Sequence, residues 1–94
     1  MLEITVGAND EIILSGRFDA SQVEKARQFF FSLAGGRVVD LTALDYISSA
    51  GLGILLATQK RLVDQGEGLR LVNPRAHIRD VFHFSGFDQV FRID

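Results

Sequence analysis

A chain of 94 residues, 47% hydrophobic and 23% charged, has the composition of a globular protein and the length of one small domain, which excludes a disordered class and a second core. Twelve acidic against ten basic residues give a net charge of −2, and no run of lysine or arginine occurs, which argues against nucleic-acid binding. The absence of cysteine excludes disulfides, thiolate metal sites and cysteine nucleophiles. Neither a signal peptide nor an apolar run of about 20 residues is visible, so we expect a cytoplasmic protein without membrane insertion, with a single domain over residues 1–94.

The first third of the chain predicts a β-hairpin followed by an amphipathic helix. Residues 2–6 and 11–15 have the pattern of strands joined by a short polar turn. Ser21 and Glu24 have the spacing of a capping box at the start of the helix, and Gly35 follows its end. Apolar residues recur along this helix at spacings of three and four: Val23, Ala26, Phe30 and Leu33. The chain is therefore expected to open with two strands and a helix.

The middle of the chain predicts a short strand, a loop and a long helix. Residues 37–41 are rich in β-branched side chains and indicate a buried central strand. After a loop, an apolar helix begins around Ser49 and ends near Gly66. The loop between the strand and the helix is expected to deliver a serine- and glycine-rich segment to the first helical turn.

The last third predicts a strand over residues 69–72, a helix, and a closing strand over residues 90–93. Asn73 as N-cap and Pro74 at the first helical position are expected to begin the helix. Four phenylalanines have core spacing, the third of them expected to be partly exposed: Phe82, Phe84, Phe87 and Phe91. The order β-β-α-β-α-β-α-β predicts an α/β fold, with a mixed sheet of about five strands and helices packed on it.

The start of the long helix is the candidate functional segment. Glycines at positions 51 and 53 cost a helix about 1 kcal/mol each, so their benefit must lie in the close approach of another surface. We expect Gly51 to be exposed to a partner, and for Gly53 both partner approach and tight packing on the sheet stay open. Ser49 lies where free N–H groups and the helix dipole favour an anion such as a phosphoryl group. The alternative is that Ser48 or Ser49 only caps the helix.

Catalytic and cofactor chemistry have little support in the sequence. His77 and His83 are six residues apart on the last helix, so they do not share a face, and neither is close in sequence to Ser49. A small serine hydrolase is therefore set aside, and we expect no enzyme, cofactor or metal site. The glycines lack the spacing and the lysine of a nucleotide-binding loop. Asp19 could contact a partner or cap the first helix, and these two alternatives stay open.

Residues 40–56, DLTALDYISSAGLGILL, resemble the STAS domain family, which includes bacterial anti-sigma factor antagonists and the cytoplasmic tails of sulfate transporters. The resemblance runs from end to end and includes three further segments: Gly16–Asp19, Asn73–Pro74 and Phe84–Phe87. In the family's antagonists the phosphorylated Ser or Thr stands at the position of Ser49. Asp often precedes it, where this chain has Ser48, and Ser or Thr often follows, where it has Ala50. The resemblance therefore implies phosphorylation of Ser49, with Ser48 as the second choice.

The resemblance also implies a function in partner switching. The unphosphorylated chain would bind an anti-sigma factor that is a serine kinase of the histidine-kinase-like ATPase type, and so release its client. Phosphorylation would end this binding, and a serine phosphatase would restore it. The partner-binding residues implied are Asp19, Ser48, Ser49, Ala50, Gly51 and Leu52. The alternative is a STAS subunit that regulates a membrane transporter, either a sulfate-type permease or a lipid-trafficking ABC system.

Overall fold

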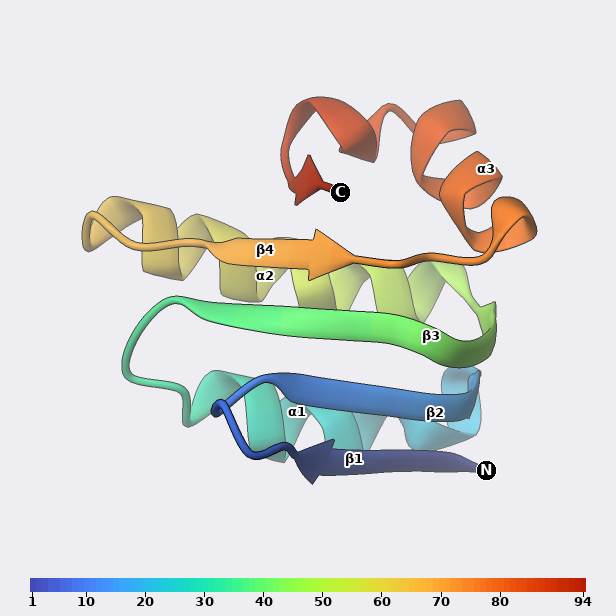
Figure 1. Cartoon of the computed structure of the whole chain (residues 1–94), viewed down its shortest axis with the longest axis horizontal. Helices are drawn as coiled ribbons and strands as arrows, with labels where there is room; N and C mark the ends of the chain where they lie inside the picture. The colour runs from blue at the N-terminus through green and yellow to red at the C-terminus, as the bar shows by residue number, and fades with distance from the viewer.

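The computed structural model describes residues 1–94 and contains one five-stranded sheet with the order β1-β2-β3-β4-β5 (Figure 1). Its strands are β1 (Leu2–Val6), β2 (Ile12–Phe18), β3 (Arg37–Ile47), β4 (Leu69–Val72) and β5 (Arg92–Ile93). The first pair is antiparallel and the other three pairs are parallel. The helices are α1 (Val23–Phe31), α2 (Ser49–Asp64) and α3 (Ala76–Phe84), with 3-10 turns η1 (Ala20–Gln22) and η2 (Phe87–Gln89). The predicted α/β class, the mixed sheet and the opening hairpin are confirmed.

Helices α1 and α2 lie side by side on one face of the sheet, behind it in Figure 1, and α3 lies beyond β4 at the far end. Along the strands, buried side chains point toward the helices and exposed ones point away from them. In β2, Ile12, Leu14 and Phe18 are buried toward the helices, whereas Arg17 is exposed on the face that carries no helix. The sheet is therefore covered on one side only.

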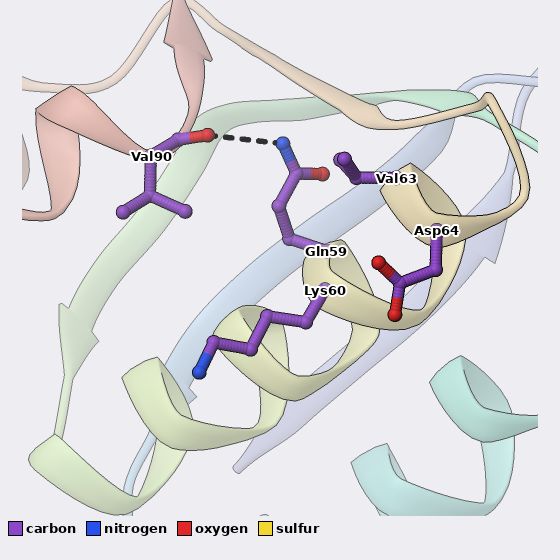
Figure 2. Close-up of a pocket in the computed structure, with 5 residues that line it drawn as sticks. All are labelled: Gln59, Lys60, Val63, Asp64 and Val90. Carbon is purple, nitrogen blue, oxygen red and sulfur yellow. Dashed lines mark hydrogen bonds between the residues drawn. The ribbon is translucent and has the colours of Figure 1, made fainter.

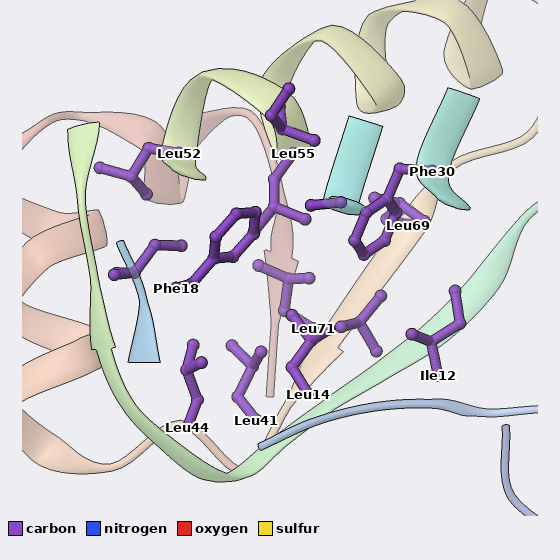
Figure 3. Packing of buried hydrophobic residues seen from close by; sticks show 14 of the residues in the cluster. Ile12, Leu14, Phe18, Phe30, Leu41, Leu44, Leu52, Leu55, Leu69 and Leu71 are labelled. Atoms are coloured by element: carbon purple, nitrogen blue, oxygen red, sulfur yellow. The ribbon is translucent and has the colours of Figure 1, made fainter. Parts of the chain in front are cut away.

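The core lies between the sheet and the helices, in a single cluster of 20 buried hydrophobic residues. Figure 3 shows Phe18 between Leu41 and Leu44 of β3 on one side and Leu52 and Leu55 of α2 on the other. All but Leu52, at 6%, are completely inaccessible to solvent. Helix α2 is thus held by its apolar face, and its first turn lies over the end of β2.

Strand β3 is much longer than predicted, because it continues to Ile47 and leaves no loop before α2. Its first four residues pair with β4, as far as Asp40, and β2 pairs with it from Val39 to Ile47. Beyond the end of β4, side chains just before α3 and in α3 form hydrogen bonds with the backbone carbonyls of β3. Arg75 Nε donates to the Thr42 carbonyl at 2.9 Å, and His77 Nε2 donates to the Asp45 carbonyl at 2.6 Å. Tertiary partners thus stabilise as strand a segment whose own residues indicated a loop.

Two predicted helix starts and one predicted strand start are wrong. Asn73 does not cap α3: it has a left-handed φ of 59°, and the helix begins at Ala76 with Arg75 as N-cap. Ser21 is not the cap of α1, because its backbone and hydroxyl groups bond to the Asp19 side chain, which caps η1 instead. The closing strand begins only at Arg92 because residues 87–89 form η2.

The four C-terminal phenylalanines have different environments. Phe82 and Phe91 are buried and meet edge to face, with ring centroids 5.7 Å apart, and Phe87 is half-buried as predicted. Phe84 contradicts the core prediction because 82% of it is exposed. It stands two residues after Phe82 on α3, which places it on the other side of the helix.

Candidate functional site

Ser48 alone connects β3 to α2. Its backbone is extended, with φ −84° and ψ 168°, and its N–H donates to the Phe18 carbonyl at 2.9 Å. Its Oγ accepts a hydrogen bond from the Gly51 N–H at 3.1 Å, the geometry of a side-chain N-cap. Of the two neighbouring serines, Ser48 is therefore the one that begins the helix.

Ser49 is the first helical residue, and its exposed side chain makes no hydrogen bond within the protein. The backbone N–H groups of a first helical turn lack acceptors within the helix, and the helix dipole is positive at this end. The Gly51 N–H is satisfied by Ser48, which leaves those of Ser49 and Ala50 to solvent or to an anion. The hydroxyl of Ser49 is thus accessible, and a negative charge placed on it would be favoured.

The structure contradicts the expectation for Gly51 and excludes one of the two alternatives left open for Gly53, tight packing on the sheet. Gly51 was predicted to be exposed, but it is buried. A Cβ at this position would lie 3.0 Å from Ile47 Cγ1 and from two ring carbons of Phe18, so the bare backbone lets the helix approach the sheet. Gly53 is exposed, and a Cβ there would meet no atom within 4 Å. Close packing therefore explains Gly51 but not Gly53.

The six residues implied for partner binding divide by burial. Ser49 and Ala50 are exposed, and Asp19 and Ser48 are partly exposed. Gly51 and Leu52 are buried, which corrects the expectation of a contact surface there: their role in the fold is to hold α2 against the core. At the start of α2 the accessible surface consists of Ser49, Ala50 and Gly53.

Asp19 lies directly after the end of β2, next to the Phe18 carbonyl that binds Ser48. Its Oδ1 accepts hydrogen bonds from the Ser21 N–H at 3.0 Å and from the Ser21 hydroxyl at 2.5 Å. The Ser21 hydroxyl is the main cause that lowers the pKa of the Asp19 carboxyl, and the charges of the N-terminal amine and Arg17 add to it. Asp19 is therefore a cap and an ionised group close to Ser48.

Two side-chain pairs, a cation–π stack and an ion pair, flank this end of β3, and neither is visible in the local sequence. The Arg17 guanidinium stacks over the ring of Tyr46, with 4.4 Å between Cζ and the ring centroid. On the other side, Arg75 forms an ion pair with Asp45. Each pair joins residues distant in the sequence, and only the strand register could have indicated the first, through the pairing of Arg17 with Tyr46.

Both histidines are exposed, and neither forms a hydrogen bond with Ser48 or Ser49. His77 bonds to the Asp45 carbonyl, and His83 Nδ1 lies 2.9 Å from Asp88 Oδ2, so neither hydrogen-bonds to Ser49. No three His, Cys, Asp or Glu side chains are grouped to hold a metal ion. The hydroxyl of Ser49 is accessible and has no base bonded to it, so the site lacks the hydrogen-bonded serine–base pair of a serine hydrolase.

An open depression of about 340 Å³ lies elsewhere, along the second half of α2 (Figure 2). It is lined by Gln59, Lys60, Val63, Asp64 and Val90. Buried Gln59 donates from Nε2 to the Val90 carbonyl at 3.1 Å and accepts from the Leu69 N–H at 2.6 Å. The amide nitrogen and the amide oxygen of Gln59 therefore join α2 to the segment before β5 and to β4, respectively. Ten residues, about 15 Å of helix, separate it from Ser49.

None of the helices combines the length and the apolar composition that a membrane span requires.

The family model described as "Mlab, STAS domain" matches residues 4–93. The chain therefore belongs to the STAS domain family. BtrV of Bordetella bronchiseptica, a proposed anti-sigma factor antagonist, is 49% identical over 57 residues, which cover 60% of this chain and 48% of BtrV. The chain thus aligns with about half the length of this relative.

Solved structures share the fold. The anti-sigma factor antagonist SpoIIAA of Bacillus superposes in its unphosphorylated form with a TM-score of 0.76 at 21% identity, covering 100% of this chain and 88% of SpoIIAA. Its phosphorylated form gives 0.71 at 20% identity and covers 100% and 91%. An anti-sigma factor antagonist from Mycobacterium paratuberculosis gives 0.81 at 24% identity, with 99% and 83% covered.

Proposed function

We propose that this chain is an anti-sigma factor antagonist whose binding is switched off by phosphorylation of Ser49. The similarity to BtrV, a proposed anti-sigma factor antagonist, and the membership of the STAS family support the antagonist function. The main observation that supports the proposed site is that two adjacent serine hydroxyls differ in their hydrogen bonding. Ser48 accepts the capping hydrogen bond from Gly51, whereas Ser49 is exposed and makes none.

A phosphoryl group on Ser49 would change the surface without unfolding it. It adds a charge of about −1.5 to −2 at a helix N-terminus, where the dipole and the free N–H groups stabilise an anion. The Ser48 cap and the burial of Gly51 are unaffected, so α2 keeps its position. A partner face that fits closely on Ala50 and Gly53, or that is itself acidic, would be repelled.

The partner in this proposal is an anti-sigma factor that is also a serine kinase of the histidine-kinase-like ATPase type. It binds the unmodified chain, releases its client, and transfers the γ-phosphoryl group of ATP to Ser49 Oγ, with ADP and a proton as the other products. A serine phosphatase hydrolyses the phosphate and restores binding. Asp19, which lies next to the Ser48 cap, extends the contact surface. The cytoplasmic location expected from the sequence belongs to the same proposal.

The experiment is phosphorylation by the ATPase encoded nearest to the gene, followed by phosphopeptide mapping. Ser48→Ala and Ser49→Ala are the paired variants, since they alter adjacent hydroxyls. We expect labelling of the wild type and of Ser48→Ala, and none of Ser49→Ala. Binding of the kinase to the wild type and to Ser49→Asp is then compared by calorimetry. Equal affinity for the phosphorylated and unmodified proteins would refute the switch.

The transporter-subunit alternative predicts the same fold and the same helix start, so the fold does not separate the two functions. Resistance of the chain to every neighbouring kinase, together with co-purification of a permease, would favour that alternative. The 49% identity to BtrV over 57 residues favours the antagonist.

A further inference from the structure

Arg17 differs from every other arginine of this chain in its contacts. The guanidinium groups of the remaining seven each make at least one hydrogen bond or ion pair within the protein. Arg17 makes neither, and its one defined contact is the stack on Tyr46, with 4.4 Å to the ring centroid. All of its N–H donors are therefore free for an external or newly formed acceptor.

The strand pairing places the backbone of Arg17 near the start of α2, while its guanidinium stacks on Tyr46 on the open face of the sheet. Phe18 pairs with Ile47, and its carbonyl accepts the Ser48 N–H at 2.9 Å. Arg17 is the residue before Phe18, which accepts that hydrogen bond, and Ser49 is the residue after Ser48, which donates it. From strand rise and spacing their Cα atoms are about 10 Å apart, which an extended arginine and a phosphoserine side chain span together. Both residues are exposed, so no packed group has to move.

Two of the other charged side chains at this end of the sheet are already engaged. Arg75 is held by the Asp45 carboxylate and by the Thr42 carbonyl. Asp19 is held by Ser21. A phosphate on Ser49 would thus have the Asp19 and Asp45 carboxylates in its vicinity, together with two cations that form no ion pair within the protein: the Arg17 guanidinium and the N-terminal amine, whose charges both lower the pKa of Asp19. An arginine fork binds phosphate through two parallel charge-assisted hydrogen bonds, which are stronger than an exposed stack on an aromatic ring.

We propose that Arg17 is the intramolecular phosphate-binding residue of this chain: when Ser49 is phosphorylated, the Arg17 guanidinium leaves the Tyr46 ring and binds the phosphate. The inference rests on the phosphorylation of Ser49 proposed above. Phosphorylation then alters the surface twice, by adding a charge at Ser49 and by uncovering Tyr46 on the open face of the sheet.

The test uses the full chain with phosphoserine incorporated at position 49 during translation, so it needs no kinase. The phosphate is titrated by phosphorus NMR in the wild type, Arg17→Lys, Arg17→Ala and Arg27→Ala. The last is a matched control, because Arg27 is also exposed and stacks on an aromatic ring, that of Phe31, at 5.6 Å. The phosphate should titrate at least about 0.5 pH lower in the wild type than in Arg17→Ala. Arg17→Lys should lie between them, and Arg27→Ala should match the wild type.

The second readout is Tyr46 itself, since the chain has one tyrosine and no tryptophan. Its ring proton signals should move on phosphorylation toward their positions in unphosphorylated Arg17→Ala. Coincident titrations of the wild type and Arg17→Ala, or unmoved Tyr46 signals, would overturn the inference. Failure of the neighbouring kinase to label Ser49 would instead count against the proposed function, because phosphoserine is introduced here independently of it.

Discussion

Alanine at positions 51 and 53 should change stability in opposite directions, although the two glycines belong to the same helix. At Gly53 the new Cβ meets open space, so the substitution contributes only the helix propensity of alanine, about 0.5–1 kcal/mol this close to the N-terminus. At Gly51 the same gain is set against a Cβ 3.0 Å from Phe18 and Ile47, where carbon atoms prefer about 3.5–4.0 Å. Overpacking of a well-packed core costs about 1–3 kcal/mol. The net expectation is a loss of about 1 kcal/mol for Gly51→Ala.

Urea and thermal unfolding followed by circular dichroism measure this difference. With about 4–8 °C per kcal/mol for a domain of this size, the two variants should melt on opposite sides of the wild type. A second substitution, Phe18→Leu, tests the cause, because it removes the outer part of the ring and gives the Cγ and Cδ atoms that the new Cβ contacts room to shift. Gly51→Ala should then cost less in the Phe18→Leu background than in the wild type. If both glycine variants are stabilised equally, Gly51 is not a packing residue.

Further predictions concern capping, a buried polar link and pH. Ser48→Ala should lower the free energy of unfolding by about 1 kcal/mol through the lost N-cap, whereas Ser49→Ala should stay within about 0.5 kcal/mol in the same urea titration. Gln59→Leu should lower the free energy of unfolding by about 2–4 kcal/mol, because two backbone groups lose their hydrogen-bond partner and one of them is buried. Lys60→Ala, a substitution at the exposed neighbouring residue, should leave stability unchanged. Equal effects of the two substitutions would refute the structural role of Gln59. Three carboxyls have a pKa below the ordinary 3.8, mainly through hydrogen bonds from Ser21, His83 and Arg70 respectively: Asp19, Asp88 and Asp94. Since a lowered pKa in the folded state stabilises above the unfolded value, stability should fall as the pH drops below about 4, and a flat profile from pH 5 to 2 would contradict this.

Local patterns in the sequence were sufficient for most elements. The hairpin, the apolar stripe of α1, the extent of α2 from Ser49 and the strand Leu69–Val72 each follow from periodicity and from glycine or polar boundaries. Local patterns failed where a partner element decides the backbone. The second half of β3 is a strand because β2 pairs with it and because Arg75 and His77 satisfy its free edge.

The candidate site shows the same division. The sequence by itself determined that a helix begins at the two serines, because a capping side chain and the apolar repeat are local properties. Only the tertiary structure decided which serine caps the helix, since that depends on how Ser48 is held by Phe18. It also decided that Gly51 is buried and Gly53 is exposed, because two residues of helix separate a side that faces the sheet from one that faces solvent. Arg17 lies 32 positions from Ser49 in the chain, and only strand pairing places it next to Tyr46, close to the end of β3.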